Sequence, residues 1–339
     1  MTAPTVSPPP PGSPRRDPAD RPAGPSLSPS RAADFKTCPL LFRFRTIDKL
    51  PEQPSADQVR GTLVHAVLES LFDLPAAERT PEAAAALVEP AWQRVLSEEP
   101  RAAEILTAAP RAGVADPAAI AAEADATGAV AVIPGQGELV DVTEAEEAAR
   151  LRNFLDSARA LLPGYFAVED PRRLEPAQRE SLVSTLIDDE LLIRGYIDRL
   201  DISPAGDLRV VDYKTGGAPR EAFEGRALFQ LKFYALVLWR TQGVVPRVLR
   251  LLYLKDAEAL DYSPDAEELE RFERTLVALS AAIERAKRDQ DFRPKPSRLC
   301  GWCNHQALCP EFGGTPPPFP AAPELLQIDT TPADDDRLA

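Results

Sequence analysis

The stretch from residue 179 to residue 288 constrains the fold more than any other part of this sequence. It contains three strand-like runs, SLVSTLI, ELLIRGYIDRLDI and DLRVVDYK, with turn-forming residues between them at 188–189 and 203–206. A helix is then expected over 226–242, a strand from Arg247 and a long amphipathic helix over 265–288. This order of strands and helices predicts an α/β fold in which helices flank a mixed β-sheet.

The two ends of the chain differ in composition from this central stretch. Residues 1–29 are rich in Pro and Ser and predict a disordered leader, so ordered sequence is expected from Ser30. Residues 314–339 form an acidic tail that is also expected to be disordered. The folded domain is therefore predicted to span 30–313.

Helices are expected before the strand-like runs. One is predicted over 56–74, because its apolar residues share a stripe: Val64, Val67, Leu68, Leu71 and Phe72. Residues 76–160 are Ala-rich and acidic, with a Gly/Pro loop around 128–137. This composition predicts a helical insertion between the first helix and the strand-rich core.

Charge and hydropathy limit the partners of the chain. The formal net charge is −14, which argues against indiscriminate binding to DNA. One basic run, opposed by only Asp289 and Asp291, is either a solvated face or the wall of a local groove: Arg285, Lys287, Arg288, Arg293, Lys295 and Arg298. No apolar stretch approaches the ~18 residues of a membrane span, so a soluble, cytoplasmic protein without membrane contacts is expected.

Two aspartates and a lysine on neighbouring predicted strands form a candidate catalytic group. Asp198 lies in GYIDRLD and Asp212 in VVDYKTG, and antiparallel pairing of these strands would bring the carboxylates together. Asp212 and Lys214 share a strand face, because they are two residues apart. Clustered carboxylates suit Mg²⁺, whereas a surface salt bridge between Asp198 and Lys214 is the alternative interpretation.

The wider order of motifs resembles the RecB-type nucleases of the PD-(D/E)xK superfamily. The motifs are GTLVHAVLE, a glutamate, GYIDRLD, DYKTG and a Q-x-x-x-Y pair one helical turn apart. The resemblance covers roughly Ser30 to Pro310 and implies a restriction-endonuclease-like sheet. The namesake Pro-Asp is absent, since Ile197 precedes Asp198.

The resemblance also implies roles for individual residues. His65, Asp198, Asp212 and the backbone carbonyl of Tyr213 would bind Mg²⁺ or Mn²⁺. Lys214 would be catalytic, and Glu180 a further acidic contributor. Gln230 and Tyr234 would lie beside the site and contact DNA. A core position is the other interpretation of His65, which falls in the apolar stretch of its predicted helix.

The four cysteines form a second candidate site. Cys300, Cys303 and Cys309 follow a C-x₂-C-x₅-C pattern, and Cys38 lies far upstream. The pattern suits zinc or an iron–sulfur cluster, and four unrelated thiols are the third alternative. The one-plus-three arrangement resembles AddB-type nucleases, which implies a [4Fe–4S] cluster that ties the ends of the domain together. His305, within the cysteine segment, is expected to be exposed.

The predicted function is a metal-dependent DNA exonuclease that acts on single strands or free ends in recombination or repair. The sequence contains no G-x-x-x-x-G-K-[ST] motor motif, so unwinding would need a separate helicase. Two alternatives stay open. One is a nuclease that processes DNA ends in CRISPR spacer acquisition, and the other is a DNA-binding module without catalysis.

Overall fold

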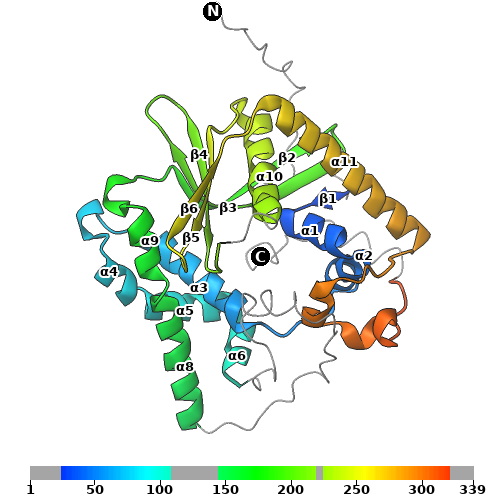
Figure 1. Ribbon diagram of the computed structural model, residues 1–339, viewed down its shortest axis with the longest axis horizontal. Coiled ribbons are helices and arrows are strands. Elements are labelled where there is room, and N and C mark those ends of the chain that lie inside the picture. The colour runs from blue at the N-terminus through cyan, green and yellow to red at the C-terminus, as the bar shows by residue number, and fades with distance from the viewer. Residues whose placement is uncertain (1–23, 108–143, 219–223, 321–339) are drawn as a thin grey trace, which may run out of the picture.

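The computed structural model describes residues 24–107, 144–218 and 224–320 (Figure 1). A six-stranded mixed sheet lies at its centre in the order β1-β3-β4-β5-β6, and β2 also pairs with β3. The strands are β1 (Ser26–Leu27), β2 (Gln178–Ile187), β3 (Leu191–Ile202), β4 (Leu208–Lys214), β5 (Val248–Tyr253) and β6 (Glu258–Tyr262). The β4–β5 and β1–β3 pairs are parallel and the others antiparallel. The expected fold class is confirmed.

Helices cover both faces of the sheet. On one side pack α1 (Pro29–Thr37), α2 (Pro39–Phe42), α10 (Glu224–Gln242) and α11 (Ala266–Asp289). On the other side lie α3 (Ala56–Leu71), α4 (Pro81–Ala86), α5 (Val88–Glu98), α6 (Glu104–Thr107), α8 (Glu144–Arg159) and α9 (Leu162–Val168). Figure 1 shows these two groups on opposite sides of the strands.

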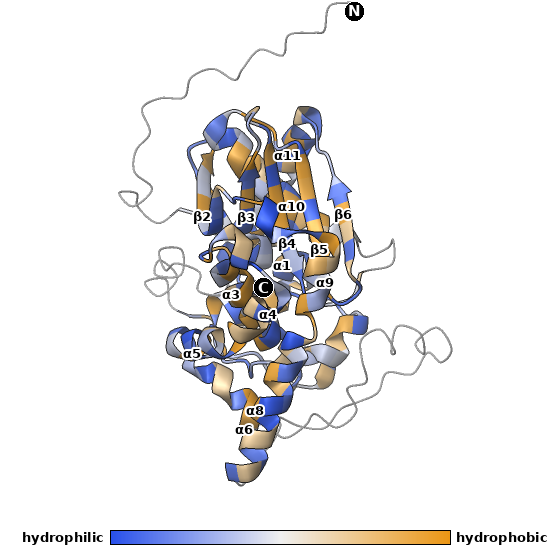
Figure 2. Ribbon diagram, turned by 90° about the vertical axis from the view of Figure 1, so that its left-hand side faces the viewer, coloured by the Kyte–Doolittle hydropathy of each residue, from blue (hydrophilic) through white to orange (hydrophobic). Residues whose placement is uncertain are grey.

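The sheet separates two hydrophobic cores. Successive residues of a strand point to opposite faces, and accordingly Val210 belongs to the core under α10 whereas Val211 belongs to the core against α3. Figure 2 shows hydrophobic residues along the central strands and hydrophilic residues along α5 at the periphery. No helix among the described residues is long and apolar enough to cross a bilayer.

The helical region before the strands is confirmed where the structure describes it. The helix expected over 56–74 is α3, which ends at Leu71. Ser55 caps this helix with a reciprocal capping box, in which Gln58 is the partner. The segments 76–107 and 144–160 are largely helical, and the Gly/Pro loop around 128–137 lies outside the described residues.

Both ends of the folded domain extend further than the sequence predicted. The leader was expected to run to residue 29, but Leu27 of β1 is buried and pairs beside Ile193. A two-residue strand is too short to give a periodic signal, which is why the sequence missed it. At the other end the tail was expected from residue 314, but Phe319 stacks on the buried Phe292. Strand β6 was also not anticipated.

Candidate active site

A gap along one edge of β3 marks the site. Strand β2 pairs with the other edge over nearly its whole length. On the gapped edge, β4 pairs with residues 199–202 and β1 with Leu192–Ile193. Between them, residues 194–198 have no strand partner on this edge among the described residues. Asp198 closes the gap with its side chain, because its Oδ2 accepts the backbone N–H of Tyr213 at 2.7 Å.

A local distortion of β2 aims Glu180 at the same point. The register passes from Arg179↔Arg199 to Ser181↔Ile197, so Glu180 lies opposite Asp198 without regular pairing. Its φ is 40°, in the left-handed region that a residue other than glycine enters at a cost of about 1–3 kcal/mol. The carboxylate then reaches within 3.7 Å of the His65 ring. Such distortions are typical of functional sites.

His65 completes a compact group of ligand atoms. Helix α3 places the His65 Nε2 atom 2.8 Å from the carbonyl oxygen of Tyr213. The Nδ1 atom lies 3.5 Å from Asp198 Oδ2 and 3.7 Å from Glu180 Oε1. One ligand atom each from His65, Glu180 and Asp198 lies within 4.8 Å of the other two. Imidazole nitrogen and carboxylate oxygens together are a donor set that fits Mn²⁺ or Mg²⁺.

Electrostatics inside this group favour bound cations. Burial alone would lower the pKa of His65, but the carboxylates of Asp198 and Glu180 outweigh it and raise the pKa to about 10. Burial also raises the pKa of the Asp198 carboxyl to about 7, against the opposing effect of His65. The carboxylates therefore hold a proton on His65 at neutral pH. A divalent cation would replace this proton and balance the same negative charge, because a metal binds the neutral imidazole.

Asp212 and Lys214 lie beside this group on β4. The Lys214 Nζ atom lies 2.9 Å from Asp212 Oδ2 and donates to Gln230 Oε1 at 2.9 Å. Burial opposes the charge of Lys214, but Asp212 and Asp198 together raise its pKa, so the ammonium stays charged. The surface salt bridge considered from the sequence is not formed, since Lys214 pairs with Asp212 and both aspartates are buried.

The Q-x-x-x-Y pair reaches the site from α10. Gln230 donates from Nε2 to the Tyr234 hydroxyl at 3.0 Å, and its own Oε1 holds Lys214. The Tyr234 ring packs against Gly195 so closely that a Cβ there would lie 2.7 Å from its Cε1. Any larger residue at position 195 would therefore collide with the Tyr234 ring, which explains the glycine in GYIDRLD.

A buried arginine behind the site was missed by the sequence reasoning. Arg199 is fully buried. It donates to the hydroxyl of Tyr213 at 2.9 Å, and its Nη1 atom lies 2.8 Å from Glu169 Oε2. It also pairs with Asp201 at 3.1 Å. The sequence D-R-x-D could have indicated the pair between Arg199 and Asp201. It could not indicate Glu169, which lies at the end of α9, far away in sequence. This network fixes Tyr213, whose backbone contacts both His65 and Asp198.

Cys38 lies against the segment that precedes the C-terminal cysteines. All four are free and half-buried. Burial raises the pKa of the Cys309 thiol, and the nearby Cys38 and Cys300 raise it further. Backbone N–H groups of Lys295 and Ser297 point at Cys38 Sγ and Cys300 Sγ, each at 3.3 Å.

The expectation that His305 is exposed was wrong. Its side chain is 4 % exposed, and its Nε2 lies 2.6 Å from Glu52 Oε1. Its ring also packs on Phe44, with 5.2 Å between centroids. A favourable partner far away in sequence explains the burial, because Glu52 lies in the segment that leads into α3.

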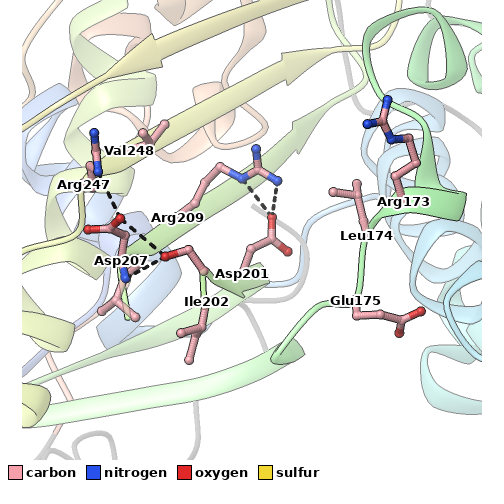
Figure 3. Close-up of a pocket in the computed structure, with 11 residues that line it drawn as sticks. Arg173, Leu174, Glu175, Asp201, Ile202, Asp207, Arg209, Arg247 and Val248 are labelled. Carbon is pink, nitrogen blue, oxygen red and sulfur yellow. Dashed lines mark hydrogen bonds and ion pairs between the residues drawn. The ribbon is translucent and has the colours of Figure 1, made fainter. Parts of the chain in front are cut away.

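A pocket of about 410 Å³ lies at the far end of β3 and β4 from the catalytic group (Figure 3). It is lined by both signs of charge: Arg173, Arg209 and Arg247 with Glu175, Asp201 and Asp207. Arg209 pairs with Asp201, and Arg247 pairs with Asp207. These pairs neutralise the walls, so the pocket does not concentrate positive charge for a phosphate.

The chain belongs to the PD-(D/E)XK nuclease superfamily, whose sequence model matches residues 26–310. Members of this superfamily use divalent metals, in agreement with the acidic group around His65.

Individual relatives are more distant. The Gene 69 proteins of Mycobacterium phages L5 and D29 are 30 % identical over 131 residues and 31 % identical over 134 residues. Each alignment covers 37 % of this chain, which spans 41 % and 45 % of those proteins. A crystal structure described as a candidate exonuclease from Eubacterium rectale aligns with 11 % identity and a TM-score of 0.44, and covers 83 % of this chain and 87 % of that one.

Proposed function

We propose that the protein is a divalent-metal-dependent DNA exonuclease of the RecB type. The observation that carries the proposal is the convergence of His65, Glu180 and Asp198 beside the charged Lys214. An acidic group with a half-buried ammonium at its edge suits phosphodiester hydrolysis, in which negative charge grows on the phosphate. In a module that only binds DNA, the acidic group without an ion would repel the phosphate backbone.

The proposed ligands of the ion are those that surround the gap in β3: His65, Asp198, Asp212 and the carbonyl oxygen of Tyr213, with Glu180 as a further acid. When bound, the ion would polarise the phosphodiester and lower the pKa of a water. The N–H of Tyr213 holds the carboxylate of Asp198, and its carbonyl oxygen contacts the His65 ring. These two contacts preorganise the ligands before the metal binds.

Lys214 would orient the attacking water or stabilise the negative charge of the transition state. Its ammonium is fixed by Asp212 on one side and by Gln230 on the other. Gln230 is in turn held by the Tyr234 hydroxyl. Because the lysine cannot swing away without breaking these bonds, its charge stays where the reaction needs it. We propose that Gln230 and Tyr234 also contact the DNA strand.

The four cysteines are proposed to hold a structural [4Fe–4S] cluster. Support comes from the backbone N–H groups of Lys295 and Ser297, which are two residues apart and point at Cys38 Sγ and Cys300 Sγ. Hydrogen bonds to sulfur are among the features that tune such clusters. His305 is committed to Glu52 and is not a ligand in this proposal. The cluster would join α1 to the C-terminal segment.

A cleavage assay tests the proposed activity. Single- and double-stranded DNA, labelled at either end, is incubated with protein and Mg²⁺ or Mn²⁺. We expect progressive shortening from an end, with loss of activity in Asp212→Ala. The matched control is Asp207→Ala, a half-buried aspartate just before β4, the strand that carries Asp212. Undiminished cleavage by Asp212→Ala would refute the site, and internal cuts would refute the exonuclease assignment. Activity of this kind favours a role in recombination or repair beside a separate helicase.

A further inference from the structure

The 3₁₀ helix η7 (Arg298–Trp302) exposes two large apolar side chains on one face. Leu299 is 39 % exposed and Trp302 is 37 % exposed. Side chains three residues apart are eclipsed on a 3₁₀ helix, so these two lie side by side. Of the other tryptophans, Trp92 is buried in the helical core and Trp239 is partly buried. An indole held at the surface beside a leucine is a flat platform for a planar ligand.

Positive charge surrounds this platform. Arg298 is the first residue of η7, and Arg293 and Lys295 precede it in the extended segment after α11. All three side chains are exposed. Arg293 pairs with Asp291, whereas Arg298 makes no ion pair within the described ranges. On a chain whose net charge is −14, this segment is a local basic region that would attract a polyanion.

Contacts join the basic segment to α1, and α1 to α10. Lys295 Nζ donates to the backbone carbonyl of Lys36 at 3.0 Å. Lys36 Nζ lies over the Phe229 ring, 4.0 Å from its centroid. The next residue of α10 is Gln230, which holds Lys214. The basic segment is therefore anchored on α1, which packs against the helix that carries Gln230.

We propose that Leu299 and Trp302, with Arg298 beside them, form a stacking platform for unpaired bases of single-stranded DNA. The proposal rests on the nuclease function proposed above. Unpaired bases can stack on an indole, and bases inside a duplex cannot. Cations next to aromatic rings are the usual composition of single-strand binding grooves. The platform holds the strand beyond the reaction centre and so selects single-stranded substrate.

Equilibrium binding tests the platform. A fluorescent oligothymidylate is titrated with protein, and anisotropy is followed with Ca²⁺ in place of the catalytic ion. Trp302→Ala should bind roughly 10- to 100-fold more weakly than wild type, the loss typical of one stacked base. Trp302→Phe keeps an aromatic face and should stay within about threefold. Val277→Ala is the matched control, since it trims an exposed apolar residue on α11.

A small substrate separates this proposal from the proposed function. Trp302→Ala should hydrolyse bis(p-nitrophenyl) phosphate with Mn²⁺ at the wild-type rate, because that substrate does not reach η7. If wild-type protein hydrolyses neither this compound nor DNA, the nuclease function is wrong. If wild type is active and Trp302→Ala binds oligothymidylate normally, the platform alone is wrong. A change in sedimentation without a change in DNA affinity would make η7 a protein contact and also overturn the platform.

A second variant covers the case in which Trp302→Ala does not fold. Arg298→Ser alters an exposed side chain at the start of η7. Loss of one phosphate contact should make the binding of oligothymidylate less steeply dependent on salt. Arg271→Ser on α11, where the arginine pairs with Glu267, is the control. Equal salt dependence in wild type and Arg298→Ser would contradict the proposal.

Discussion

The backbone N–H of Tyr213 donates to Oδ2 of Asp198 at a distance of 2.7 Å. This bond takes the place of a ladder bond at the point where the pairing between β3 and β4 stops. It holds a buried carboxylate between two strands, and the carbonyl of the same tyrosine lies beside His65. One residue of β4 therefore fixes both an acid and an imidazole of the candidate metal site.

The hydroxyl of Tyr213 should contribute to stability through Arg199. Tyr213→Phe removes a hydrogen bond from a fully buried guanidinium, and we expect a loss of about 1–3 kcal/mol in the free energy of unfolding. Tyr165→Phe is the matched control, because the buried Tyr165 hydroxyl has no hydrogen-bond partner among the residues that the structure describes. Urea denaturation of both variants measures the difference. Equal stability of the two variants would contradict the role assigned to Arg199.

Gly195→Ala should disturb the site without touching a ligand. The added methyl group would lie 2.7 Å from the Tyr234 ring, so the ring must move and Gln230 with it. We expect about 1–3 kcal/mol lower stability from overpacking and a fall in DNA cleavage of tenfold or more. Gly225→Ala serves as the control, because Gly225 lies on α10, the helix that carries Tyr234, and has open space around it. Cleavage by Gly195→Ala at the control rate would show that this packing does not matter.

Lys214→Gln should separate catalysis from metal binding. Removal of the ammonium is expected to lower the cleavage rate by roughly 100- to 1,000-fold, as for other groups that stabilise charge in the transition state. Binding of Mn²⁺, measured by calorimetry, should persist, because the proposed ligands remain. Glu180→Gln, at the acid close to the His65 ring, should instead weaken Mn²⁺ binding. Loss of Mn²⁺ binding in Lys214→Gln would argue that the lysine holds the site together.

Acid should destabilise the contacts that Glu52 makes with His305 and Arg45. Burial opposes the charged carboxylate, but hydrogen bonds from His305 and Arg45 lower the pKa of Glu52 from 4.5 to about 2. A depressed pKa stabilises the fold fully above pH 4.5, and this contribution is lost as the pH falls from about 4.5 towards 2. The charged carboxylate of Glu52 contributes roughly 2–3 kcal/mol to the free energy of unfolding, after a discount for its partial exposure to solvent. Glu52→Gln should therefore be less stable at pH 7 and lose less stability on acidification, by urea denaturation at each pH. The exposed Glu78→Gln is the control, and parallel profiles for wild type and Glu52→Gln would refute the assignment.

Protein purified without oxygen should be brown and contain about four iron atoms, as a [4Fe–4S] cluster requires. Cys309→Ala should lose both colour and iron. Its melting temperature should fall more than that of Lys214→Ala, because the cluster would join the two ends of the domain. Iron analysis and thermal unfolding check this. A colourless protein with one equivalent of zinc would favour the zinc alternative, and equal melting temperatures would contradict a structural role.

Local sequence determined most of the core strands and the relative placement of Asp212 and Lys214. Because side chains alternate along a strand, Asp212-x-Lys214 had to share a face, and the structure places their charged atoms 2.9 Å apart. The periodicity of α3 and α11 was equally readable. Short elements such as β1 could not be predicted, because two residues are too few to show a periodic pattern of hydrophobic residues.

Tertiary structure decided which distant groups meet. Glu180 reaches His65 only because β2 is distorted beside Asp198. Arg199 is buried because Glu169, from the end of α9, neutralises it. His305 is buried where Glu52 meets its ring nitrogen. A charged side chain enters the interior only with a partner. Periodicity in the sequence shows which face a residue takes, but the partner across that face is set by the packing of the whole chain.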